Sequence, residues 1–133
     1  MPRVETFPET FSLEEILPLI GNDQPLIYRQ WEIKLRSCRL SCFKRSVKCS
    51  FCNREGKFFK LVREKRDRQN NGKPHLNLFS ADGVLMTKDH ILPKSYGGKN
   101  TKHNLRTMCA ECNSNRGNSF PWDDWWFKLL AEK

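Results

Sequence analysis

The chain has 133 residues, a hydrophobic content of 38%, a charged fraction of 29% and a formal net charge of +9 at pH 7. This length predicts a single domain with a modest core, and the sequence contains no apolar run of about 18 residues that would predict a membrane-spanning helix. The first residues lack the apolar segment of a signal peptide, so we expect a cytoplasmic protein without membrane partners.

The positive charge is concentrated in one part of the chain. Residues 28–68 contain fourteen basic and four acidic residues, a net charge of +10, whereas residues 1–27 contain one basic and five acidic residues, a net charge of −4. Clustered Lys and Arg side chains bind phosphate backbones by releasing counterions. A polyanion is therefore the expected partner, with solubility alone as the alternative. The acidic N-terminal residues are expected either to dock a protein partner or to cover the basic face.

The N-terminal region is expected to contain an extended arm and two helices. Residues 1–10 include two prolines and predict the arm. Ser12 and Glu15 form a capping-box pattern, which predicts a short helix ending near residue 20. In residues 25–45, apolar side chains recur every three or four positions and predict one amphipathic helix with a basic outer face. The candidates on this face for contact with a nucleic acid are Arg36, Arg39, Lys44 and Arg45.

Six cysteines in a cytoplasmic protein indicate metal binding rather than disulfides. Four of them form two Cys-x-x-Cys pairs with 56 residues between them, Cys49 with Cys52 and Cys109 with Cys112. Four thiolates suit a structural tetrahedral zinc ion, which would stabilise a small core. Redox pairs and free core cysteines are alternatives. Cys38 and Cys42 are expected to be small buried residues. The alternative is that they bind the metal in place of Cys49 and Cys52, but their spacing on a helix is less suitable.

The rest of the chain predicts strands, a polar loop and two helices. These elements are a strand over residues 57–62, a loop over 63–74, a hairpin of strands 76–80 and 84–87, a short helix over 107–116 ending at Gly117, and a C-terminal helix over 121–130. The tryptophans of the last helix are expected to pack on the core, with base stacking as the alternative.

The second strand of this hairpin leads into residues suited to phosphodiester hydrolysis. Asp89 and Asn113 offer oxygen ligands for a divalent cation, and His90 offers a base that removes a proton from water. Adjacent residues of a strand point to opposite faces, so Asp89 and His90 share a site only if the strand twists or the substrate bridges them. His103 is an alternative third ligand, and His75 is expected on the surface.

Residues 47–117 combine Cys-x-x-Cys, Asp-His-Ile-x-Pro-x-Ser-x-Gly-Gly and Asn-Leu-x-x-x-Cys-x-x-Cys-Asn. This combination resembles the HNH endonuclease family with its ββα-metal fold. The resemblance implies an α+β protein that folds as one unit. Residues 47–117 would form a zinc-stapled HNH core, residues 1–46 would pack on it through the basic helix, and residues 118–133 would add a C-terminal helix.

The resemblance also implies a role for each residue of the motif. His90 would be the general base, and Asn104 would orient it through the loop. Asp89 and Asn113 would hold one Mg²⁺ or Mn²⁺ ion. Arg116 would face the phosphate. Apart from the resemblance, Lys94 in the Gly-Gly loop is a candidate for phosphate contact, with a solvated side chain as the alternative.

We therefore predict a metal-dependent endonuclease that acts on double-stranded DNA, in a bacterial or phage-infected cell. Few residues are placed to read bases and a monomer presents one site, so nicking or weak sequence specificity is expected. The alternatives are a non-catalytic zinc-dependent DNA-binding module and an RNA-directed nuclease of the same fold.

Overall fold

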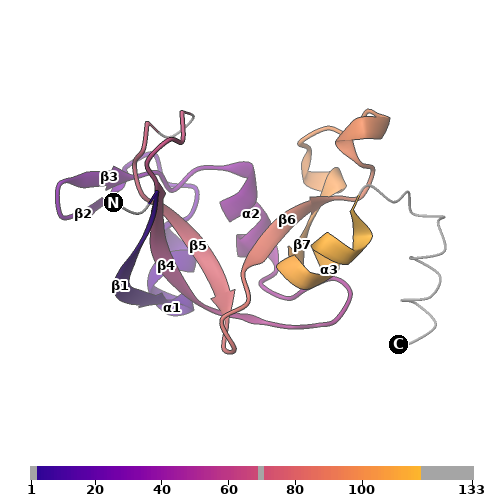
Figure 1. Ribbon diagram of the computed structural model, residues 1–133, viewed down its shortest axis with the longest axis horizontal. Helices are drawn as coiled ribbons and strands as arrows, with labels where there is room; N and C mark the ends of the chain where they lie inside the picture. The colour runs from indigo at the N-terminus through magenta and orange to yellow at the C-terminus, as the bar shows by residue number, and fades with distance from the viewer. Residues whose placement is uncertain (1–2, 69–70, 118–133) are drawn as a thin grey trace.

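The computed structural model describes residues 3–68 and 71–117, so the predicted helix over 121–130 lies outside the described residues. Its elements in chain order are β1 Val4–Ser12, α1 Leu13–Ile16, the 3₁₀ helix η1 Leu17–Leu19, β2 Leu26–Tyr28, β3 Trp31–Ile33, α2 Cys38–Arg45, β4 Gly56–Glu64, β5 His75–Ser80, β6 Met86–His90, the 3₁₀ helices η2 Lys94–Tyr96 and η3 Lys102–Asn104, β7 Leu105–Cys109 and α3 Ala110–Arg116. Figure 1 shows β1–β5 on one side of the molecule and β6, β7 and α3 on the other, with α2 between them.

The first side is built on a three-stranded antiparallel sheet in the order β1-β4-β5. The expected extended arm is instead an edge strand, because Phe7 is buried in the core and β1 pairs with β4. The register shifts between Thr6 and Thr10, where Pro8 interrupts the ladder because it has no N–H to donate. The capping box at α1 is confirmed: Ser12 Oγ accepts from Glu15 N at 3.1 Å, and Glu15 accepts from Ser12 N at 3.3 Å.

The prediction of one helix over residues 25–45 is wrong. β2 and β3 form a hairpin there, and α2 begins only at Cys38, where Ser37 Oγ caps the amide of Leu40 at 3.0 Å. Buried Ile33 and Leu35 alternate with exposed neighbours, a period of two that suits a strand. Both periods are present in this stretch, and packing on the sheet favours the strand.

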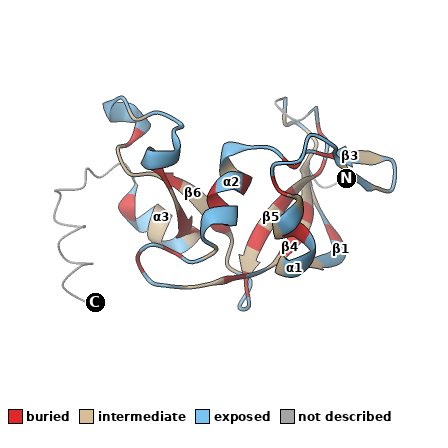
Figure 2. Cartoon of the chain, turned by 180° about the vertical axis from the view of Figure 1, so that it is seen from behind, coloured by how far each residue is buried: buried red, intermediate tan, exposed pale blue. Residues whose placement is uncertain are grey.

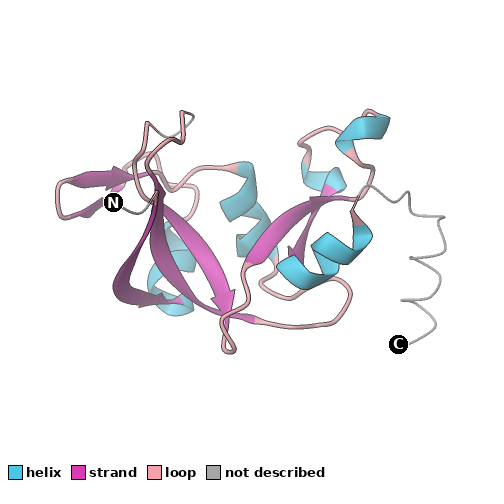
Figure 3. Cartoon of the chain, viewed as in Figure 1, coloured by secondary structure: helices cyan, strands magenta, loops and turns pink. Residues whose placement is uncertain are grey.

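The predicted hairpin of residues 76–87 is right in its turn, but its two strands pair with each other only at the isolated antiparallel bridge between Phe79 and Leu85. Ser80 N donates to Val84 O at 2.9 Å, but β5 pairs with β4 and β6 pairs with β7. The turn therefore joins two different sheets (Figure 3). The predicted helix over 107–116 is also shorter than expected, because residues 107–109 complete β7 and α3 starts at Ala110. Gly117 ends α3 with φ of +56°, as predicted.

The second side is the ββα unit of β6, β7 and α3, which confirms the α+β class. One buried cluster includes residues of both sides, such as Phe59 and Leu78 from the sheet and Met86 and Met108 from the ribbon of β6 and β7. Phe43 of α2 lies between them, and Figure 2 shows the buried positions of α2. Within the described chain, no helix is long and apolar enough to cross a membrane.

Candidate functional site

Four sulfur atoms meet where α3 begins. The Sγ atoms of Cys49, Cys52, Cys109 and Cys112 all lie within 4.8 Å of one another. Cys52 and Cys109 are 3.6 Å apart. A tetrahedral zinc ion with Zn–S bonds of about 2.3 Å needs sulfurs about 3.8 Å apart. The cluster therefore fits a structural zinc ion, and the predicted pairing of the two Cys-x-x-Cys elements is confirmed.

Local backbone structure places each pair of thiols. The first pair lies on a tight turn in which Asn53, at φ +63°, donates its amide to Cys49 O at 3.2 Å. This turn is attached to β7, since Ser50 N donates to Thr107 O at 3.0 Å. In the second pair, Cys109 caps α3 and accepts from Cys112 N at 3.5 Å. The turn and the helix cap thus converge on one point.

The surroundings of the cluster favour the thiolate form at Cys49. Burial raises the pKa of Cys49, but amide hydrogen bonds from the second pair and the turn outweigh it and lower this pKa to about 7. Burial raises the pKa of Cys112. Arg54 donates to Cys109 Sγ at 3.4 Å and to Glu111 at 3.1 Å, so a positive charge lies against the sulfurs. A charge there offsets the negative charge of four thiolates around one ion. Nothing in the sequence pattern singled out Arg54.

Cys38 and Cys42 lie outside the cluster. Cys42 is buried, as expected, with its Sγ 3.5 Å from Thr107 Oγ1. Cys38 is exposed, because it starts α2 at the surface rather than continuing a long buried stripe.

His90 ends β6 and is held by a residue that the motif did not identify. Its Nε2 lies 2.6 Å from Asn100 Oδ1, and the ring is partly exposed. Asn100 belongs to the loop between η2 and η3, next to Gly97 and Gly98. A side chain at Gly98 would place its Cβ 1.7 Å from Leu92 O, so this tight loop requires glycine there.

Asn104 closes the same loop. Its side chain accepts from Leu92 N at 2.7 Å and donates to Leu92 O at 3.1 Å and to Lys99 O at 3.0 Å. Its own carbonyl accepts from Ile91 N at 2.9 Å. Asn104 therefore positions the segment that carries Asn100, which in turn contacts His90.

Asp89 is engaged by two arginines. The carboxylate is 5% exposed, accepts from Arg116 Nη1 at 2.7 and 2.8 Å, and accepts from Arg106 Nε at 2.9 Å. Arg116 is 2% exposed and also donates to His90 O at 2.5 Å and Ile91 O at 2.7 Å. Arg116 thus fastens α3 to the end of β6, and its expected place facing a phosphate is not where the structure puts it.

The side chains predicted to hold a divalent cation are engaged by protein partners in this structure. Two guanidinium groups already neutralise Asp89, and their charge repels a cation placed at the same oxygens. Asn113 donates to Thr87 Oγ1 at 2.8 Å. The side chains of Thr87 and Asp89 contact α3, whereas the side chain of His90 contacts the loop, as the alternation of side chains along a strand requires. His103, the alternative ligand, is exposed.

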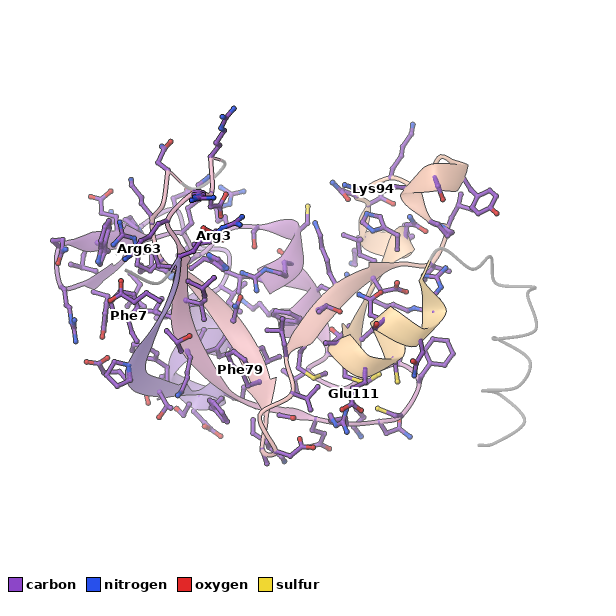
Figure 4. The ribbon with its side chains drawn as sticks, viewed as in Figure 1. Arg3, Phe7, Arg63, Phe79, Lys94 and Glu111 are labelled. Atoms are coloured by element: carbon purple, nitrogen blue, oxygen red, sulfur yellow. The ribbon has the colours of Figure 1, made fainter. Side chains whose placement is uncertain are left out.

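The predicted nucleic-acid-binding residues divide into two groups. Arg39 is half-buried and donates to Asn77 Oδ1 at 2.9 Å and to Leu76 O at 2.7 Å, and burial lowers its pKa to about 10. His75, expected on the surface, is half-buried beside it, and burial lowers its pKa. The residues that remain exposed are Arg36, Lys44, Arg45 and Lys94. Figure 4 labels Lys94, the first residue of η2.

The ββα unit is the part of the chain that is similar to known proteins. A family model described as HNH endonuclease matches residues 80–122, which include β6, β7 and α3. Neither the curated proteins nor the solved structures gave a match to this chain. Residues 80–122, which contain the ββα arrangement and two of the four clustered cysteines, are therefore similar to the HNH endonuclease family.

Proposed function

We propose that this protein is an endonuclease that hydrolyses phosphodiester bonds in DNA, with His90 as the general base. The observation that carries the proposal is the placement of His90 within the family-matched segment, partly exposed and held at Nε2 by Asn100. With the amide oxygen as acceptor, Nε2 carries the proton and Nδ1 has the lone pair. A neutral imidazole oriented in this way removes a proton from an attacking water.

HNH domains use metal ions, and two ions enter the proposal differently. The cysteine cluster fits zinc, which we propose as the structural ion. For the catalytic ion, Mg²⁺ or Mn²⁺ is proposed as a requirement of the reaction. Because Asp89 is engaged by Arg106 and Arg116, the sequence-based ligand set of Asp89 and Asn113 remains a hypothesis, and no step is derived through it.

One observation favours a second candidate. If Asp89 serves only to hold Arg106 and Arg116, the chain retains the zinc cluster and the basic surface of a DNA-binding module without needing a catalytic ion. This module would bind DNA and leave it intact.

Supercoiled plasmid distinguishes the two candidates. Incubation with zinc-loaded protein and Mg²⁺ or Mn²⁺ is expected to produce the open-circular form before any linear form, because a monomer with one site cuts one strand per encounter. The family resemblance implies cleavage that leaves 5′-phosphate and 3′-hydroxyl ends, and DNA ligase is expected to reseal a nick with such ends. Unchanged supercoiled plasmid with either ion would favour the binding module. Preferential cutting of labelled RNA in a parallel incubation would identify RNA, and not DNA, as the substrate. Direct formation of linear plasmid with uniform ends would contradict nicking.

A further inference from the structure

A basic hollow of about 750 Å³ lies between α2 and the segment that leads into β7. We call it the α2 groove. Its charged lining residues are Arg36, Lys44, Arg45 and Lys102, and no carboxylate is among the described residues that line it. The groove is formed partly by residues 20–45, outside the segment that matches the family. It is therefore a feature of this chain beyond the ββα unit.

Two of the four positive charges of the groove, Lys44 and Arg45, are held in place by backbone carbonyls. Lys44 Nζ donates to Ile20 O at 2.8 Å. Arg45 donates to Lys102 O at 2.7 Å and to Leu105 O at 3.3 Å. A carbonyl fixes the position of a cation without cancelling its charge, so these side chains present a preorganised positive surface. Arg36 differs, because it pairs with the exposed carboxylate of Asp23.

The groove reaches the residue that holds the proposed base. Asn100 lines the groove and contacts His90 Nε2 at 2.6 Å. Cys38 also lines the groove, with its Sγ 4.0 Å from Asn100 O. In Figure 1, α2 lies beside β6. A chain of phosphates in the groove would therefore pass close to His90.

We propose that the α2 groove binds the phosphodiester backbone of a DNA strand and leads it to His90. Three observations support this assignment. Backbone carbonyls hold Lys44 and Arg45 in place, no carboxylate is among the described residues that line the groove, and Asn100 lines the groove and contacts His90. The destination of the strand rests on the proposed nuclease function, whereas binding in the groove depends only on charge and shape.

A matched pair of double variants tests the binding. Lys44→Gln with Lys102→Gln removes two charges from the groove. Lys48→Gln with Lys57→Gln removes two charges from residues that both pair with Glu55, outside the groove. Both doubles have the same net charge, and both are made in a His90→Ala background so that DNA stays intact. Thermal melting establishes that each double is folded.

Fluorescence anisotropy with a labelled DNA duplex is measured over a range of salt concentrations. Each lost phosphate contact lowers the slope of log K against log salt by about 0.9. The groove double is expected to lower this slope by roughly 1.8, and the control double is expected to leave it unchanged. Equal weakening by the two doubles would overturn the proposal.

Alkylation of Cys38 gives a second measurement that needs no charge variant. Cys38 is exposed and lines the groove, so saturating DNA is expected to slow its reaction with iodoacetamide severalfold, as read by peptide mass spectrometry. An unchanged rate would contradict the groove. Plasmid cutting is scored separately: cutting without protection of Cys38 rejects the groove alone, and protection without cutting supports the groove and rejects the nuclease.

Discussion

Replacing Cys109 with serine is expected to release the metal of the cysteine cluster and to abolish cooperative folding. A structural zinc site contributes on the order of 10 kcal/mol to folding, and whole domains are stable by only about 5–15 kcal/mol. Cys109 is completely buried at the junction of β7 and α3, and its sulfur faces the turn that carries the first cysteine pair. Loss of this ligand therefore weakens the connection between β7, α3 and the turn that carries Cys49 and Cys52.

Cys42→Ser is the matched control for this substitution. Its thiol is also buried but lies outside the cluster, beside Thr107 Oγ1, which can accept or donate a hydrogen bond to serine. Elemental analysis is expected to give about one zinc ion per chain for the wild type and Cys42→Ser, and none for Cys109→Ser. Circular dichroism on heating is expected to show a cooperative transition only for the first two. A zinc-free Cys109→Ser protein that melts like the wild type would contradict the zinc assignment.

Asp89→Asn is expected to lower the free energy of unfolding of the zinc-loaded protein by about 3–5 kcal/mol. Removing one partner of a buried ion pair leaves the other charge buried without compensation, which is costly. Here Arg116 is 2% exposed, and Asp89 accepts hydrogen bonds from both Arg116 and Arg106. The loss would detach the end of α3 from β6.

Asp23→Asn is the control, because it breaks a surface ion pair. The side chains of this pair, Arg36 and Asp23, are 66% and 85% exposed. Such pairs contribute at most about 1 kcal/mol. Urea denaturation measures both variants. Equal losses in the two would contradict a structural role for Asp89. Stabilisation of the wild type by Mg²⁺ that disappears in Asp89→Asn would instead support the metal-ligand hypothesis.

The parts of the fold that the sequence predicted well are those governed by local chemistry. Cysteine spacing identified the four sulfurs, Ser12 with Glu15 identified the start of α1, and Gly117 identified the end of α3. Each of these signals depends on residue types that have few structural uses. The family resemblance then gave the ββα unit that the structure contains.

The parts that were predicted wrongly depend on long-range partners. Apolar residues in 25–45 satisfy a helical period over most of the stretch and a strand period around Ile33, and only packing against the sheet decides between them. The turn after Ser80 was recognisable, but the strands on its two sides pair mainly with other strands. β5 pairs with β4, and β6 pairs with β7, which follows β6 only after the loop that contains η2 and η3.

The candidate site shows the same limit. Asp89 and Arg116 were both identified as functional from the motif, yet their mutual ion pair is visible only once α3 is packed on β6. Asn100 carries no motif of its own, and its contact with His90 follows from the path of the loop that Asn104 closes.

The most direct test of the central claim compares the rate of plasmid nicking by the wild type and His90→Ala. Among the described residues, the His90 side chain forms its hydrogen bond with Asn100, in the exposed loop, so the variant is expected to fold, bind zinc and bind DNA as the wild type does. Loss of a general base typically lowers the rate by about 10²–10⁴-fold, and we expect a decrease in this range. Equal nicking rates for the two proteins would contradict the assignment of His90 as the general base and with it the proposed active site.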